Sequence, residues 1–265
     1  MEPTSPQSSP AIPIAIIFGF AMIALAIFFT NRTSNAPVIA INPETGQEQV
    51  IPEGTPRPVS EKDYILGNPN APILLVEYSD YECPFCQQYH QTLNQIMDEY
   101  GVTGKVAWAY RQFPLTELHP NAAKISEAAL CVGDIGGSDA FWKFTNLIFE
   151  GRQPGEFTNV TKIPSFAEQS GVTIDDYAKC LNEGRMKTEL AEQMSDGVKA
   201  GAYSTPYTVL IVGNQQVVIS GAQPYDTVKG IVQNLIDQLE GEFDPATVED
   251  VPELPTNEIG VPILQ

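Results

Sequence analysis

Basic residues are scarce in this sequence of 265 residues, which holds 14 lysines and arginines against 33 aspartates and glutamates, for a net charge of −19 with histidine neutral. A nucleic-acid-binding protein neutralises phosphates with clustered lysine and arginine, so this composition excludes nucleic acid as a partner. The same shortage argues against binding to anionic lipid headgroups. Cysteine is also sparse, and four residues are too few for a miniature fold built on dense disulfides.

Charge is absent altogether from Ala11 to Thr30, a run of twenty residues. A helix of this length covers about 30 Å, the thickness of the hydrocarbon core of a bilayer. A buried core helix would carry a polar face, which this run lacks. A cleaved signal peptide would begin with a basic segment, whereas the only charged side chain in residues 1–10 is that of Glu2. We therefore predict a transmembrane anchor at 11–30 after an N-terminal tail at 1–10.

The orientation of this span stays open on charge alone. Arg32 is the nearest side-chain cation and follows the span, and the positive-inside rule places such a residue in the cytoplasm. One arginine is a weak signal, and large domains cross the membrane largely regardless of charge. The redox chemistry argued below favours a single-pass protein of the cell membrane with its domain on the extracytoplasmic side.

Two proline-rich segments frame the predicted domain at 63–240. Residues 31–62 hold five prolines, which is typical of a semi-extended linker. Residues 241–265 hold six acidic residues, four prolines and no lysine or arginine, which indicates a solvated acidic tail.

The hydrophobic pattern between these segments predicts an α/β domain. Residues 72–78 are almost continuously apolar, as in a strand that is buried on both faces. We predict strands at 72–78, 105–111, 207–212 and 216–220, and helices at 84–100, 121–132, 139–150, 165–171, 175–199 and 225–240. This order is that of a thioredoxin-like fold with a helical insertion at about 115–200.

Cys83, Pro84, Phe85 and Cys86 stand where the first predicted strand ends and a helix begins. Two thiols separated by two residues can close a short disulfide. The free N–H groups and the positive dipole end of a helix N-terminus stabilise a thiolate, which is the nucleophile of disulfide exchange. We therefore predict that Cys83 attacks and that Cys86 resolves the mixed disulfide.

Zinc binding and an inert staple are the two alternatives for this pair. A structural zinc site would need a second close pair of ligands, but Cys131 and Cys180 are separated from each other by 49 positions. A staple around two residues would constrain little chain entropy. The spacing therefore favours redox chemistry, with no metal.

Residues 76–86, with the sequence VEYSDYECPFC, resemble the active-site stretch of the DsbA-like thiol–disulfide oxidoreductases. Further matches are YRQFPL at 110–115, AALC at 128–131 and STP at 204–206. Together they cover roughly residues 62–240. A CxxC at a strand–helix junction combined with a late Thr-Pro is a fairly specific pattern.

The resemblance implies roles for three further residues. The late proline of this family is cis and packs against the disulfide, so Thr205 and Pro206 are expected to shape the groove that binds an extended substrate. Glu77, six residues before Cys83, occupies the family's acidic position. Such a buried carboxyl has a raised pKa and can shuttle the proton of Cys86, although a partly solvated glutamate at a strand edge is the alternative.

The motif departs from that of DsbA at one position, and the sequence holds a second pair of cysteines. DsbA itself has histidine where this chain has Phe85, so we expect a less depressed pKa at Cys83 and a weaker oxidant. Cys131 and Cys180 are either two buried free thiols or a structural disulfide. Related proteins carry a disulfide at similar places in the helical part, which implies the second.

The resemblance thus implies a membrane-anchored enzyme that forms disulfides in unfolded exported proteins, needs no cofactor, and is recycled by a membrane redox partner. We expect a monomer, because the linker at 31–62 is too short for the dimerisation domain of related isomerases. One alternative is an isomerase or reductase of the same fold. If Arg32 decides the orientation of the span, the domain is a cytosolic reductase. The third alternative is a peptide-binding module without catalysis.

Overall fold

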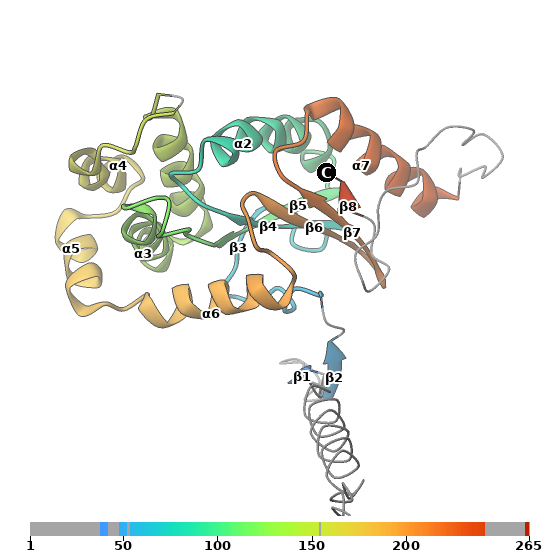
Figure 1. The fold of residues 1–265 in the computed structure, drawn as a ribbon, viewed down its shortest axis with the longest axis horizontal. Helices are drawn as coiled ribbons and strands as arrows, with labels where there is room; N and C mark the ends of the chain where they lie inside the picture. The colour runs from blue at the N-terminus through green and yellow to red at the C-terminus, as the bar shows by residue number, and fades with distance from the viewer. Residues whose placement is uncertain (1–37, 42–47, 52–53, 154, 242–262, 265) are drawn as a thin grey trace, which may run out of the picture.

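The computed structural model describes residues 38–41, 48–51, 54–153, 155–241 and 263–264 (Figure 1). The predicted tail at 1–10, the predicted anchor at 11–30 and most of the acidic tail lie outside the described residues. Within the described part, no helix has the length and apolar character needed to span a membrane.

A mixed sheet forms the centre of the domain (Figure 1). β4 runs parallel to β5 and antiparallel to β6, and β3 pairs antiparallel with the other side of β5. The strands lie in the order β3 (Tyr64–Gly67), β5 (Val106–Gln112), β4 (Ile73–Ser79), β6 (Tyr207–Val212), β7 (Gln215–Ser220) and β8 (Ile263–Leu264). β3 was not predicted, and β8 lies beside β7 although the sequence indicated a solvated tail there.

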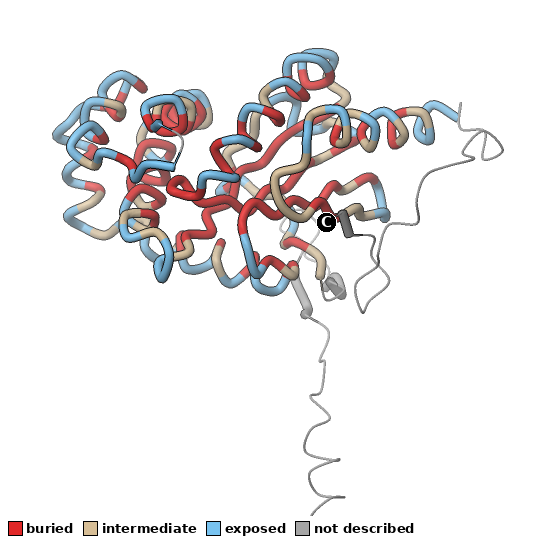
Figure 2. Tube along the Cα trace, turned by 45° about the horizontal axis from the view of Figure 1, so that its top comes forward, coloured by how far each residue is buried: buried red, intermediate tan, exposed pale blue. Residues whose placement is uncertain are grey.

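Helices cover both faces of this sheet. α2 (Pro84–Ile96), which continues as the π-helical turn η1 (Met97–Gly101), and α7 (Tyr225–Glu240) lie on one face, and α6 (Lys187–Lys199) lies on the other (Figure 1). The insertion between β5 and β6 also holds α3 (Ala122–Glu150), η2 (Val160–Lys162), α4 (Ile163–Gln169) and α5 (Ile174–Glu183). The central strands are buried along their length, as the apolar run at 72–78 predicts (Figure 2).

Two glycines set the ends of the helical segments in the insertion. The predicted helices at 121–132 and 139–150 meet at Gly137, which has a φ of 75° and breaks the helical path within α3. The prediction of one helix at 175–199 is wrong, because Gly184 has a φ of 60° and ends α5 in the left-handed conformation. Only glycine takes up this conformation at little cost, so the chain turns there before α6 begins.

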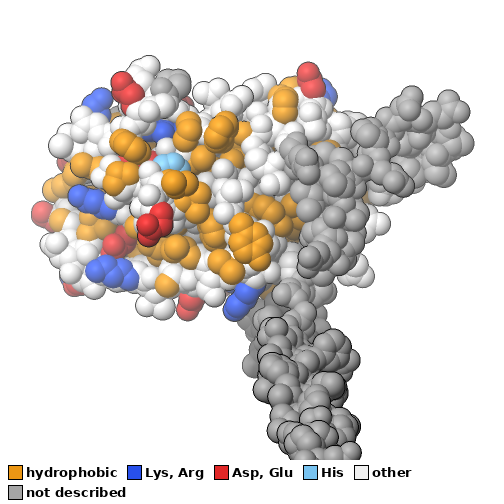
Figure 3. Space-filling view, in the orientation of Figure 1, with side chains coloured by type: hydrophobic (Ala, Val, Ile, Leu, Met, Phe, Trp, Pro, Cys, Tyr) orange, Lys and Arg blue, Asp and Glu red, His pale blue; other side chains and the backbone are white. Residues whose placement is uncertain are grey.

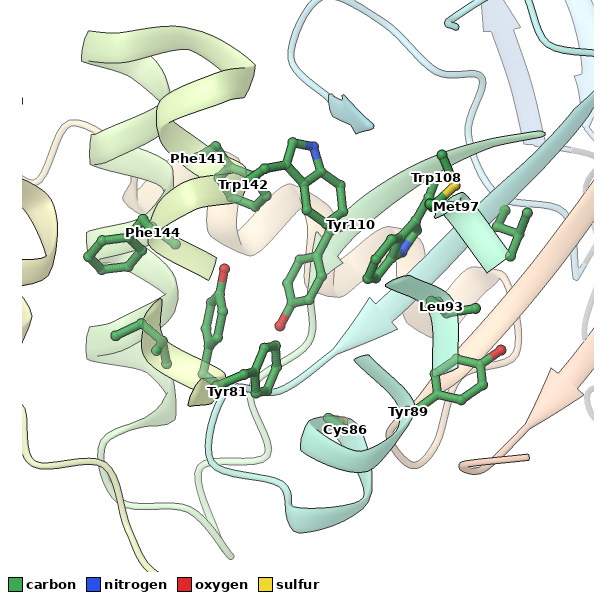
Figure 4. Packing of buried hydrophobic residues seen from close by; sticks show 14 of the residues in the cluster. Tyr81, Cys86, Tyr89, Leu93, Met97, Trp108, Tyr110, Phe141, Trp142 and Phe144 are labelled. Carbon is green, nitrogen blue, oxygen red and sulfur yellow. The ribbon is translucent and has the colours of Figure 1, made fainter. Parts of the chain in front are cut away.

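Aromatic side chains pack the insertion against the sheet (Figure 4). Trp142 of α3 lies with its ring centre 4.5 Å from that of Trp108 on β5, and its ring meets that of Tyr110 edge to face at 6.2 Å. Tyr81, in the turn before α2, stacks on Tyr110 at 5.2 Å. These contacts fix the position of α3 relative to the first turn of α2.

The end of the predicted linker packs against α6. The backbone N–H of Gly54 donates to the carbonyl of Lys199 at 3.0 Å, and the N–H of Arg57 donates to Oδ1 of Asp196 at 2.7 Å. The side chain of Arg57 also pairs with Asp63 at 3.1 Å. Earlier in the same predicted linker, β1 (Val38–Ile41) and β2 (Glu48–Ile51) form an antiparallel pair.

Candidate active site

The two cysteines of the CPFC segment lie at the N-terminus of α2. Cys83 is the N-cap residue with extended backbone angles, and Pro84 follows at the first helical position, where its missing N–H costs nothing. Cys86 lies one turn further on in α2 (Figure 4). It is fully buried, whereas 4% of Cys83 is exposed. Both thiols are free in the structure, which therefore shows the reduced pair.

The surroundings of the two thiols separate their pKa values. The Cys86 thiol donates a hydrogen bond that lowers the pKa of Cys83 to about 6 against the cost of burial, and the backbone N–H groups of Cys86 and Phe85 and the hydroxyl of Thr205 add to the effect. Burial raises the pKa of Cys86 well above its ordinary value, and the charges of Cys83 and Glu77 raise it further. Cys83 is thus the thiolate near neutral pH, and Cys86 keeps its proton.

Glu77 lies on β4 and is fully buried. Burial raises its pKa to about 8, although the polar side chains of Ser79 and Trp108 oppose the shift. Trp108 donates from Nε1 to Oε2 of Glu77 at 3.0 Å. The carboxyl is therefore largely protonated at neutral pH and can give up a proton when a strong base forms nearby. The Cys86 thiolate is such a base, and it lies near enough to Glu77 that the charge of the carboxylate raises the pKa of Cys86.

Thr205 and Pro206 lie directly before β6, beside the redox pair. The peptide bond between them is cis. Cys83 Sγ donates a hydrogen bond to the carbonyl of Thr205 at 3.5 Å, which places this turn against the first cysteine. The carbonyl of Pro206 accepts from the N–H of Gly221 at 2.9 Å and so continues the pairing of β6 with β7.

A network that the sequence analysis missed holds the turn before α2. Asp80 accepts hydrogen bonds from the N–H groups of Glu82 and Leu115, each at 2.7 Å, and its Oδ2 lies 2.8 Å from Nδ1 of His119. The buried carboxylate of Glu82 accepts from the N–H of Asn121 at 2.7 Å. The two acidic residues that flank Tyr81 were the available signal, but their partners are distant in the sequence.

Arg152 completes this network from the segment after α3. It donates to the carbonyl of Glu82 at 2.7 Å and to that of Cys83 at 2.9 Å. Gln87 of α2 donates to the carbonyls of Phe149 and Arg152 at 2.6 and 2.7 Å. The redox motif is therefore bound to the helical insertion through both side-chain and backbone groups. The sequence gave no sign of Arg152, because about 70 positions separate it from the motif.

Large apolar side chains are exposed at segments that contact the redox turn. Phe85 within the motif is 61% exposed, and Tyr203 shortly before Thr205 is 83% exposed. The side chains of Leu118 and Phe157 are also more than half exposed. Each stands directly before a residue that contacts the redox turn: His119 lies against Asp80, and the N–H of Thr158 donates to Glu82. Figure 3 shows several apolar side chains on the middle of the face in view. Such groups suit contact with an apolar polypeptide segment.

The other two cysteines form a disulfide within the insertion. Cys131 of α3 and Cys180 of α5 are both fully buried and are joined by an S–S bond of 1.98 Å. The described residues contain no group of three or more histidine, cysteine, aspartate or glutamate side chains placed to hold a metal ion.

The family model described as thioredoxin matches residues 59–234, which is more than half of the chain. The chain belongs to the thioredoxin family. Its fold is also similar to that of a solved structure of α-DsbA1 from Wolbachia pipientis, with a TM-score of 0.59, 20% identity, and coverage of 71% of this chain and 96% of that one. The predicted DsbA-like thioredoxin fold with a helical insertion is therefore confirmed.

Curated relatives of this thioredoxin-family chain include two kinds of protein. It is 26% identical over 224 residues to a putative protein-disulfide oxidoreductase of Rickettsia prowazekii. This match covers 83% of the chain and 76% of the relative. It is 28% identical over 155 residues to the Na⁺/H⁺ antiporter NhaA 1 of Salinispora arenicola, which covers 58% of this chain. The chain spans about a fifth of the length of that antiporter, since the match covers 22% of it.

Proposed function

We propose that this protein is a membrane-anchored thiol–disulfide oxidoreductase that forms disulfides in exported proteins. The observation that carries the proposal is the contrast between its two thiols: the pKa of Cys83 is lowered to about 6, and that of the buried Cys86 is raised well above its ordinary value. A pair divided in this way has one sulfur that is exchanged with substrate and one that resolves.

The reaction begins with the oxidised Cys83–Cys86 pair. A substrate thiolate attacks Cys83 Sγ, so that a mixed disulfide forms and the bond to Cys86 breaks. Cys86 leaves as a thiolate and takes the proton of the Glu77 carboxyl. A second substrate thiolate then attacks the substrate sulfur of the mixed disulfide, and Cys83 leaves as a thiolate. Two electrons pass from the substrate dithiol to the enzyme pair.

Substrate binding falls to the segments around the pair. Thr205 and Pro206 border the first cysteine, and the exposed Phe85 and its apolar neighbours suit an unfolded, extended polypeptide. Reoxidation needs a partner that removes two electrons from the reduced pair, and we assign this step to a redox protein of the membrane.

The proposed location rests on two features. The uncharged run at 11–30 is long enough for a single membrane span. The disulfide between Cys131 and Cys180 suits an oxidising compartment and therefore a domain on the extracytoplasmic side.

One observation favours a second candidate, a reductase or isomerase of the same fold. The pKa of Cys83, about 6, is closer to the value of about 7 for the thioredoxin cysteine than to the value of about 3.5 for DsbA. A thiolate that is less stabilised leaves the disulfide less oxidising. Phe85 agrees with this, because its ring has no hydrogen-bond donor.

The test is oxidative refolding of a reduced, unfolded secreted protein by the oxidised full-length chain in detergent, with its redox potential measured against glutathione. We expect formation of substrate disulfides, and a potential well above that of thioredoxin for an oxidase. C83S should abolish exchange. C86A, mixed with a disulfide-bonded substrate, should accumulate a mixed disulfide, because Cys83 attacks the substrate disulfide and Cys86 is not there to resolve the product. A wild-type protein that neither oxidises nor reduces any thiol substrate, or a C83S variant with full activity, would contradict the proposal.

A further inference from the structure

Arg152 is a buried cation next to the redox pair, and nothing in the CPFC motif points to it. Only 4% of the residue is exposed. Its guanidinium donates from Nη1 to the carbonyls of Glu82 and Glu156, at 2.7 and 3.1 Å, and from Nη2 to the carbonyl of Cys83 at 2.9 Å. The guanidinium therefore lies along the backbone that leads into α2, and it contacts the backbone of the residue that carries the reactive sulfur.

The contacts of Arg152 leave its charge without a carboxylate partner. None of the ion pairs among the described residues includes Arg152. The carboxylate of Glu82 accepts from Asn121 and from the N–H of Thr158 and makes no ion pair with Arg152, although its charge and that of Asp80 also favour the charged guanidinium. Burying a cation is costly unless an anion or several hydrogen bonds compensate, so the site is suited to an anion that forms part of the time.

The Cys83 thiolate is the anion that the contacts point to, because Nη2 of Arg152 donates to the carbonyl of the same residue at 2.9 Å. Burial lowers the pKa of Arg152, and the negative charge on Cys83 is the largest influence that opposes this shift. The interaction is mutual: a cation that is stabilised by the thiolate stabilises the thiolate to the same extent. A guanidinium keeps its proton at neutral pH, so its charge is always present.

The position of Arg152 is fixed from the side of α2 as well. Gln87 donates from Nε2 to the carbonyl of Arg152 at 2.7 Å and to that of Phe149 at 2.6 Å. α2 thus holds the backbone of Arg152 through Gln87, and the side chain of Arg152 contacts the N-terminus of the same helix. This arrangement places the charge with little freedom to move, which preserves its effect on the sulfur.

We propose that Arg152 is a positioning residue of the redox centre, which holds the turn at Glu82 and Cys83 and keeps a fixed positive charge at the backbone of the residue that forms the thiolate. The inference rests on the proposed function, because it concerns the same pair of thiols. The thiolate is present in the reduced form and absent from the disulfide. Arg152 therefore favours the reduced pair and makes the disulfide more oxidising.

Two substitutions separate the charge from the hydrogen bonds. R152Q keeps an amide donor for the carbonyls but removes the charge, whereas R152K keeps the charge but removes the planar fork of donors. R185Q is the matched control, since it removes the same charge from an arginine whose ion pairs are with Asp134 and Glu183. Circular dichroism and thermal unfolding show whether each variant is folded.

The deciding measurement is the pH midpoint of thiolate absorbance, and of iodoacetamide alkylation at Cys83, in the reduced proteins. We expect R152Q to move the midpoint upward by about one pH unit, R152K to move it by less than half as much, and R185Q to leave it in place. R152Q should also shift the equilibrium with glutathione toward the disulfide by up to about tenfold above pH 8. Folded R152Q with the wild-type midpoint would overturn the proposal and leave Arg152 a purely structural clamp.

These outcomes are distinct from failure of the proposed function. A wild-type protein that exchanges disulfides while R152Q keeps the wild-type midpoint contradicts only the role of Arg152. A wild-type protein that exchanges none contradicts the proposed function, whatever the midpoint. If R152Q does not fold, R152K decides: a midpoint shifted as far as a full pH unit with the charge retained overturns the proposal, and a midpoint near that of wild type supports it.

Discussion

Trp108 determines which oxygen of Glu77 carries the proton. An indole N–H only donates, so Oε2 of Glu77, at 3.0 Å from Nε1, acts as an acceptor in this contact. The proton of the neutral carboxyl is therefore favoured on Oε1, which accepts no hydrogen bond from the described residues. That oxygen is the one free to supply Cys86 with a proton when the disulfide opens.

The buried carboxyl of Glu77 makes stability depend on pH. Its pKa is about 8 in the folded protein and near 4.5 in the unfolded chain, so between these values the folded state holds a proton that the unfolded chain has lost. Stability then falls as the pH rises from about 4.5 through 8. Glutamine cannot ionise, and we expect E77Q to be more stable than wild type by roughly 4 kcal/mol at pH 8 and by little at pH 4.5, in urea unfolding.

The control for this experiment is E117Q, which changes an exposed glutamate. Its difference from wild type should not vary with pH as that of E77Q does. Stopped-flow measurements should also show slower formation of the mixed disulfide in E77Q, because the amide has no proton to give to Cys86 when the Cys83–Cys86 bond opens. An E77Q difference that stays constant from pH 4.5 to 8 would contradict the raised pKa.

The disulfide in the insertion closes a long loop, with a sequence separation of 49 between Cys131 and Cys180. The chain-entropy model gives about 4 kcal/mol for a loop of this size. We expect C131A/C180A to lose about that much stability in urea unfolding. C131A and C180A alone should each cost about as much as the double variant, since either one breaks the same bond. Fully additive single effects would show that the loss comes from side-chain packing instead.

The buried arginine of β5 supports the face of the sheet opposite the redox pair. Arg111 pairs with Asp63 and Asp196, each at 2.7 Å, and with Tyr78 it forms a network beneath α6. R111M leaves the carboxylate of Asp196 without a cation and that of Asp63 with Arg57 alone, and we expect a loss of about 4 kcal/mol in thermal or urea unfolding. R57M should cost less, because Arg57 is partly exposed.

The pH dependence of R111M tests the cause of that loss. Burial by itself would raise the pKa of Asp63, but the charges of Arg111 and Arg57 hold it below its ordinary value. Without Arg111 the aspartate should take up a proton in mild acid, so the difference between R111M and wild type should shrink as the pH falls toward 4. A difference that is the same at pH 4 and pH 7 would attribute the loss to packing.

Local patterns were enough to predict the frame of the domain. The apolar run at 72–78 and the CxxC after it place β4 and α2, because a doubly buried strand and a helix start have strong sequence signals. β3 has only four residues and gains its place by pairing with β5, which no local pattern shows. Gly184 also escaped prediction, since a glycine within a polar helical stretch costs only about 1 kcal/mol and does not by itself mark an end.

The position of the CPFC segment at the start of α2 was predictable, but its surroundings were not. Cys83 and Cys86 are neighbours along the chain, so a local pattern is enough to find them. Arg152 and Thr158 reach the same turn only because the insertion folds back over α2. Their roles depend on the tertiary fold, and arginine and threonine at these positions have no distinctive local pattern.

The covalent link between α3 and α5 has a consequence for the biogenesis of the protein. A nascent copy must itself acquire the Cys131–Cys180 bond before its insertion reaches full rigidity, so it begins life as a client of the same chemistry that we assign to its mature form. Under the proposed function, mature copies with an oxidised CPFC pair supply that bond to new ones. The rate of maturation then rises with the number of mature copies.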